Sequence, residues 1–251
     1  MPILSLGNLR LRWLFAELFV VVLGILIAFQ IEQWREERAA RVLTIANLEA
    51  MLFELEDEFS EVALKINSLE ENIEGIANLS TALINDRMLD SAWLGQTYGR
   101  AVSGRIWQPS APTYLGLRES GQLHLFENFK LRAELFDYYE YAAFVNSLLT
   151  TEAATRQQLI EVSRRDIFGI TEIAPGSDEI TSRRYVVEPV EDFPRHPDFL
   201  GTLSNLGRVT SNLLPRLESL LERNTELKQS ILEYLGIQGI QELEIPTRAV
   251  S

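Results

Sequence analysis

The sequence contains no cysteine and only two histidines, so several kinds of functional site are excluded or poorly supplied. Without cysteine, neither disulfides nor thiolate metal sites can form. His124 and His196 stand far apart and belong to no His-x-x-x-His pair, so we expect both to be structural or exposed. Nucleotide-binding loops, the G-x-S-x-G turn and the kinase motifs are also missing. We therefore expect no metal site, no cofactor and no enzymatic activity.

Lysine is scarce, and acidic residues outnumber basic ones. Three lysines accompany twenty arginines, and the formal net charge is −13. Because nucleic-acid binding requires basic surface that neutralises phosphates, we expect no nucleic-acid partner. The acidic surplus suits solubility or attraction to a basic partner. We interpret the densest acidic run as a solvated helix face rather than a metal site. It comprises Glu54, Glu56, Asp57, Glu58 and Glu61.

Only one long hydrophobic run is present. It extends from Trp13 to Phe29 and contains a single charge, Glu17. Seventeen helical residues reach about 25 Å, close to the hydrocarbon thickness of about 30 Å. Trp13 and Trp34 suit the two headgroup regions, so residues 13–34 are predicted to form a transmembrane helix in contact with lipid. A cleaved signal peptide is the rival interpretation, but the run is long and no pair of small residues follows it.

The charges that flank this segment leave its orientation open. Arg10 and Arg12 precede it, whereas Arg35, Arg38 and Arg41 follow it, and this count slightly favours a cytoplasmic domain. Long domains cross membranes largely regardless of such charges, and a signal-anchor needs only a short basic leader. We expect an extracytoplasmic domain.

One side of the predicted membrane helix collects a carboxylate and two small residues. At 100° per residue, Gly24 and Ala28 lie within about 20° of Glu17. A small-xxx-small pair lets another helix approach closely, and a carboxylate in a membrane requires a partner or water. We predict that Glu17, Gly24 and Ala28 contact another membrane helix. In the alternative interpretation, Glu17 simply reaches the headgroups from its place near the end of the run.

The start of the chain resembles the N-terminal signature of a family of uncharacterised bacterial single-pass membrane proteins. Residues 16–38 read A-E-L-F-V-V-V-L-G-I-L-I-A-F-Q-I-E-Q-W-R-E-E-R, against G-E-I, V-V-x-G-I-L-I-A-L-Q and W-x-x-x-R in the family. Residues 113–123, T-Y-L-G-L-R-E-S-G-Q-L, with Tyr138 and Tyr139, look like its second recurring region. Ala16 replaces the family's usual glycine. The resemblance implies a single-pass protein of a bacterial inner membrane, but no reaction. Together with the extracytoplasmic side expected above, it predicts a periplasmic domain.

Beyond the membrane segment, the apolar residues follow a heptad spacing that predicts a long helix. The seam continues the stripe of Glu17 and Gly24, on a helix from Trp34 to about Ile84 that is about 75 Å long. Extra apolar residues beside the seam favour a bundle over a two-stranded coiled coil. The seam residues are Ile45, Leu48, Leu52, Leu55, Phe59, Val62, Ile66, Leu69, Ile73 and Ile76.

Capping and breaking residues divide the rest of the chain. Asp90 is predicted to cap a short helix that runs to Val102. Ser110 is the expected N-cap of a compact helix that has Pro112 in its first turn and ends at Gly121.

Two longer helices are predicted to follow, separated by an irregular stretch. Asn128 caps the first, which runs to about Ile167, and Asp198 caps the second, which ends at Gly236 and is kinked or split at Pro215. Residues 169–197 are rich in proline and are predicted to form an irregular docking loop with a short strand at 185–187.

These elements define an all-α fold, in which one N-terminal transmembrane helix continues into an elongated antiparallel helical bundle. The first and last seams are expected to face each other. The predicted segments are a leader at 1–12, the membrane helix at 13–34, the bundle at 35–236 and a tail at 237–251.

Three function classes remain open. The first is a non-enzymatic structural or accessory subunit docked on other membrane protein subunits, for example of a photosynthetic or respiratory complex, or else a self-associating stalk. The second is a sensor-like bundle with a ligand pocket formed by aromatic residues, although residues at helical spacing more often fill a core. A hydrolase is a distant third. The pocket residues would be Trp107, Tyr114, Tyr138 and Tyr139.

Overall fold

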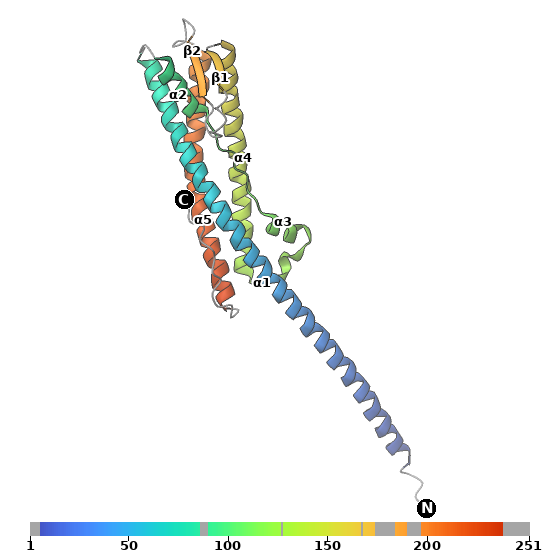
Figure 1. Cartoon of the computed structure of the whole chain (residues 1–251). Helices are drawn as coiled ribbons and strands as arrows, with labels where there is room; N and C mark the ends of the chain where they lie inside the picture. The colour runs from blue at the N-terminus through green and yellow to red at the C-terminus, as the bar shows by residue number, and fades with distance from the viewer. Residues whose placement is uncertain are drawn as a thin grey trace, which may run out of the picture.

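The computed structural model confirms the predicted fold: one long N-terminal helix continues into an elongated helical bundle (Figure 1). The described residues are 6–85, 90–126, 128–166, 168–173, 184–189 and 197–237. The elements are α1 (Leu6–Ile84), α2 (Ser91–Val102), α3 (Pro112–Glu119), the 3-10 turn η1 (Gln122–Leu125), α4 (Phe129–Asp166), β1 (Phe168–Ile173), β2 (Arg184–Pro189) and α5 (Pro197–Ile237).

Helix α1 is continuous over 79 residues and contains no proline. Its first half stands away from the rest of the molecule, and its second half forms one side of the bundle (Figure 1). Burial begins at Thr44, about 15 Å beyond Trp34 at 1.5 Å per residue. Every residue of the predicted seam is buried or half-buried. The heptad pattern therefore identified the inward face of α1 correctly.

The bundle is built from α1, α4 and α5, with α2 at the end far from the exposed apolar half of α1 (Figure 1). Helix α5 runs antiparallel to α1, and the two pack together as predicted. Helices α1 and α4 run in the same direction: Glu58 meets Tyr138, and further along both helices Asn72 meets Arg156. This parallel pair arises because residues 103–111 return the chain along the bundle before α4 begins.

The short helices show which capping predictions were right. The Asp90 side chain accepts from Trp93 N at 3.1 Å, and that of Asn128 accepts from Leu131 N at 3.1 Å. Gly121 has φ of 69°, the left-handed conformation expected of a glycine after a helix.

Three helix boundaries differ from the prediction. Ser110 is not the N-cap of α3, because that position belongs to Ala111, which offers no capping side chain. Asp198 lies inside the first turn of α5, which begins at Pro197. Pro215 lies within α5, which continues through it unsplit to Ile237.

The stretch predicted as an irregular loop contains an antiparallel pair of strands. Ile170 of β1 lies opposite Val187 of β2. Strand β2 confirms the short strand predicted at 185–187, whereas β1 was not predicted. The docking role of this stretch stays a prediction. Strand β2 lies beside α2. The intervening residues, His196 and the tail beyond Ile237 lie outside the described residues.

Candidate functional site

The three residues predicted to contact another membrane helix lie on the free half of α1. Glu17, Gly24 and Ala28 are all exposed, and a Cβ built on Gly24 would meet nothing within 4 Å. The described part of the chain therefore offers this stripe no partner of its own. The helix contact stays a prediction, and its partner would have to come from another chain or another copy.

A tryptophan and an arginine mark the end of the apolar part of α1. The Arg38 guanidinium lies 5.5 Å from the ring centre of exposed Trp34. Such a pair suits the headgroup region, where an amphipathic ring and a long cationic side chain both find polar surroundings. By length and composition, α1 is the one helix among the described residues that could cross a membrane.

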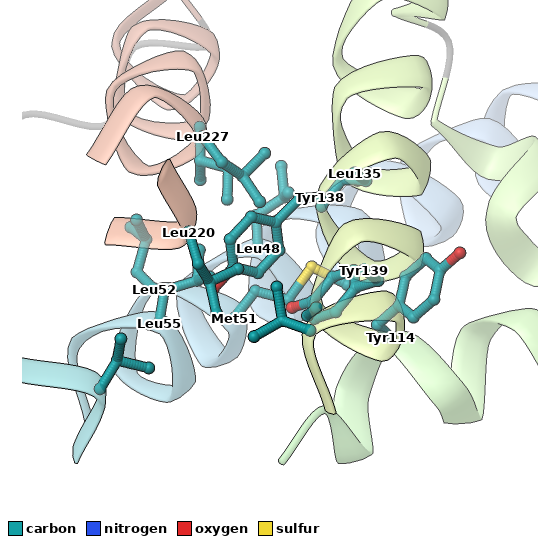
Figure 2. Close-up of a cluster of buried hydrophobic side chains, with 14 of the residues drawn as sticks. Leu48, Met51, Leu52, Leu55, Tyr114, Leu135, Tyr138, Tyr139, Leu220 and Leu227 are labelled. Carbon is teal, nitrogen blue, oxygen red and sulfur yellow. The ribbon is translucent and has the colours of Figure 1, made fainter. Parts of the chain in front are cut away.

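The four aromatic residues predicted as a pocket are buried in one hydrophobic core. Tyr114 of α3 stacks on Tyr139 of α4 with ring centres 4.1 Å apart, and Tyr138 meets Tyr139 edge-on at 5.1 Å (Figure 2). Trp107 belongs to the same core. The rings fill the space between α3 and α4, so a ligand would have to separate them. The pocket stays a prediction.

A buried polar network joins the three long helices beside these rings. The Tyr138 hydroxyl donates to Glu58 Oε2 at 2.7 Å and accepts from Asn224 Nδ2 at 3.0 Å. Asn224 Nδ2 also lies 3.0 Å from the Leu55 carbonyl oxygen, to which it donates. Glu58 Oε1 and Asn224 Oδ1 are buried and accept no hydrogen bond in the described part of the chain. These hydrogen bonds fix how far α1, α4 and α5 are shifted along one another.

The environment of Glu58 favours its neutral form. Only 6% of its surface is exposed, which contradicts our interpretation of the acidic run as a solvated face at this position. Burial, opposed by the hydrogen bond from Tyr138 and aided by the nearby carboxylate of Glu54, raises the pKa of Glu58 to about 7. Burial also raises the pKa of Tyr138 and Tyr139. Glu58 therefore titrates close to neutral pH.

Glu54 caps the N-terminus of α3. One of its carboxylate oxygens accepts from both the backbone N–H, at 3.2 Å, and the hydroxyl of Thr113. A carboxylate at this place satisfies an unpaired N–H group of the first turn and interacts favourably with the helix dipole. Glu54 thus replaces the missing capping side chain of Ala111, from a position distant in sequence.

A second buried polar cluster lies further along the bundle. It holds residues 103–111, which we call the returning segment, against α1 and α4. Lys65 Nζ donates to the Arg105 carbonyl oxygen at 2.8 Å, and burial lowers the pKa of Lys65 to about 8. Arg156 pairs with buried Glu152 and donates to Asn72 Oδ1 at 3.2 Å.

Close packing of the returning segment explains a glycine in it. A Cβ on Gly104 would fall 1.7 Å from Arg156 Nη1, so any other residue there would displace the Arg156 guanidinium. Asn72 Nδ2 donates to the Arg100 carbonyl oxygen at 2.6 Å and to Ser103 Oγ at 3.0 Å.

The buried polar residues of α1 lie outside the predicted apolar seam, but a heptad pattern in the sequence marks them too. They recur every seventh position in a single column of α1, beside the seam. The column is Thr44, Met51, Glu58, Lys65, Asn72 and Leu79, all buried. Because this column also holds apolar Met51 and Leu79 and adjoins the seam column of Leu48 and Leu55, its polar members are expected to point inward and to have buried partners.

His124 is exposed, with its Nδ1 2.6 Å from the Gly121 carbonyl oxygen, and within the described ranges no three of the metal-ligating residue types come together. No family model matches the chain, and neither the curated proteins nor the solved structures contain a match to it.

Proposed function

We propose that the protein is a non-enzymatic, single-pass accessory subunit that docks on a larger membrane protein complex. Its membrane helix would contact another subunit, and its helical bundle would hold an extramembrane partner at a fixed place. A bacterial inner membrane with the bundle in the periplasm is the setting that we propose.

The continuity of α1 carries this proposal. The same helix supplies the exposed apolar segment and the central face of the bundle, with no break between Trp34 and Thr44. A flexible linker would let the bundle sample many positions, whereas a continuous helix restricts it to a narrow range. This arrangement suits a protein that positions partners.

The buried charges also support a structural role. Glu58 is bonded to Tyr138, Glu152 to Arg156 and Lys65 to a backbone carbonyl. Groups engaged in this way hold helices in register, whereas a catalytic centre presents reactive groups to a substrate.

The test compares a contact-face variant with a lipid-face variant in the full chain. Gly24→Leu should disrupt the helix contact and reduce the size of the complex in mild detergent, because leucine blocks close approach. Val22→Leu, on the opposite side of α1, should leave that size unchanged. Membrane insertion of both variants is the control.

Each outcome separates the alternatives. An unchanged complex in Gly24→Leu would refute the helix contact. A complex that contains only this chain would support a self-associating stalk, and a wild-type protein that migrates alone in the mildest detergents would contradict the accessory-subunit proposal.

A further inference from the structure

The hydrogen-bond donors at the junction of α1, α4 and α5 are all engaged. The Tyr138 hydroxyl donates to Glu58 Oε2. Both hydrogens of Asn224 Nδ2 are used, one on the Tyr138 oxygen and one on the Leu55 carbonyl oxygen. Two buried acceptors, Glu58 Oε1 and Asn224 Oδ1, are left without a donor in the described part of the chain. A proton on the Glu58 carboxyl adds a donor and removes a buried charge, so this arrangement favours a neutral Glu58.

Within the described ranges, the groups that face Glu58 carry no positive charge. They are Glu54 from α1, Tyr138 and Tyr139 from α4 and the Asn224 amide from α5. The bases of α5 near Asn224 are engaged elsewhere. Lys228 donates to Glu56 at 2.7 Å, and the Arg223 guanidinium lies 4.3 Å from the ring centre of Tyr141. An ionised Glu58 therefore has no cation beside it.

Glu54 connects this junction to α3. It precedes Glu58 by one turn on the same side of α1, and one of its oxygens accepts from the N–H and the hydroxyl of Thr113 at the start of α3. Its other oxygen is buried and accepts no hydrogen bond from the described residues. Ionisation of Glu58 places a second negative charge beside this carboxylate. The repulsion between the two carboxylates acts directly on the cap of α3.

Helix α3 depends on its attachment to the bundle. It has eight residues and stands to one side of the long helices (Figure 1). A helix this short is unstable by itself, so the Glu54 cap and the buried side chains of Tyr114 and Leu117 hold it in place.

The chain on both sides of α3 is fixed independently. Lys65 Nζ holds the Arg105 carbonyl oxygen before α3, and Asn128 caps α4 after it. Residues 112–125, which comprise α3 and η1, can therefore open locally while their flanks stay in place.

A row of three tyrosine rings connects α3 with the buried carboxyl groups. Tyr138 meets Tyr139 at 5.1 Å, and Tyr139 stacks on Tyr114 of α3 at 4.1 Å (Figure 2). Tyr138 is bonded to Glu58, and Tyr139 lies close enough to the two carboxyl groups for both to raise its pKa. Movement of α3 away from the bundle uncovers Tyr139 and opens a path for water to this region.

We propose that α3 and η1 form a latch on the bundle that is controlled by the proton of Glu58. The latch is held shut while Glu58 is neutral. It opens more readily once Glu58 is ionised, because opening lets the carboxylates of Glu58 and Glu54 reach water. Opening also uncovers the inward sides of Tyr114 and Leu117, so the apolar surface of the bundle changes with pH. This inference goes beyond the proposed function and concerns the bundle alone.

The test is amide hydrogen exchange of the full chain in detergent, followed by mass spectrometry at about pH 6 and about pH 8.5. Each rate is divided by the intrinsic exchange rate at that pH. With a pKa of about 7 for Glu58 in the closed form and 4.5 in the open form, linkage predicts that the open fraction of α3 rises about tenfold over this range. Peptides from α3 should lose protection accordingly, whereas peptides from α2, another short helix of the bundle, should not.

Three variants separate the proton from the strength of the latch. Glu58→Gln should keep α3 protected at both pH values, because glutamine is neutral and still accepts from Tyr138. Glu61→Gln is the matched control, since this exposed carboxylate pairs with Arg105, and it should keep the wild-type response. Thr113→Val loses one hydrogen bond to Glu54 and should speed the exchange of α3 by the same factor at both pH values.

Three results would overturn the inference. The first is equal protection of α3 at the two pH values in the wild type, and the second is a pH response that Glu58→Gln retains. The third is a loss of protection in α2 and α3 together, because the bundle would then open as a whole. If Glu58→Gln fails to fold, the comparison of α3 with α2 in the wild type still decides the matter.

Discussion

Replacing Glu58 with glutamine should stabilise the protein in alkaline solution and leave it nearly unchanged in acid. In the folded protein the Glu58 carboxyl has a pKa of about 7, against an ordinary value of 4.5. The groups that face it are Glu54 from α1, Tyr138 and Tyr139 from α4 and the Asn224 amide from α5. None of these carries a positive charge that would stabilise the ionised form.

The sign follows from proton linkage. Between pH 4.5 and 7 the folded chain holds a proton on Glu58 that the unfolded chain has lost, so the free energy of unfolding falls as pH rises. At about 1.4 kcal/mol for each pH unit between the two pKa values, the loss approaches about 3 kcal/mol above pH 7. Glutamine is neutral at every pH and can still accept from the Tyr138 hydroxyl. The variant should therefore escape this loss.

The measurement is a series of thermal melts of the full chain in detergent, followed by circular dichroism from about pH 5 to about pH 8.5. A gain of about 3 kcal/mol corresponds to a rise in Tm of about 6 to 12 °C for a domain of this size, present at the alkaline end of the series and absent at the acidic end. Glu61→Gln, at an exposed position paired with Arg105, is the control and should show no such growing difference. A difference from wild type that stays constant with pH, or a less stable Glu58→Gln protein at the alkaline end, would refute the reasoning.

Two further predictions concern the far end of the bundle and the returning segment. Deleting residues 170–196 should weaken partner binding in a pull-down and leave a helical core that melts cooperatively, because the core lies among α1, α2, α4 and α5. An unfolded product would show that the strand pair belongs to the core. Gly104→Ala should destabilise the protein by about 2 kcal/mol or more in denaturant melts, because the new methyl group displaces Arg156 from its buried partners, whereas Gly116→Ala, where a Cβ meets nothing, should not.

The sequence could predict the parts of this fold that depend on local or periodic information. The heptad seam located the buried face of α1, and Asp90, Asn128 and Gly121 marked helix ends through bonds within a few residues of themselves. The cap of α3 escaped prediction because Glu54, 59 residues away, supplies it.

Other features depended on tertiary context. Glu58 belongs to an acidic run of the kind that usually faces water, and its burial follows from Tyr138, which only the folded chain brings near. The parallel direction of α1 and α4 depends on the path of residues 103–111. This segment is neither helix nor strand, so no periodic pattern in the sequence could predict its path. The sequence also did not show that Phe129, Phe136 and Phe144 of α4 are exposed. An isolated apolar residue on a helix does not reveal which side of that helix its neighbours cover.

Because α1 is unbroken, its apolar half and the bundle move together as one stiff unit. If the apolar segment spans a membrane as we propose, a change in its tilt swings the whole bundle, because the same helix also forms one side of the core. Over the roughly 75 Å from Trp34 to Ile84, a tilt of about 10° displaces the far end by about 13 Å. In that proposed setting, small changes in the tilt of the apolar segment become large displacements of α2 and the strand pair at the other end of the bundle.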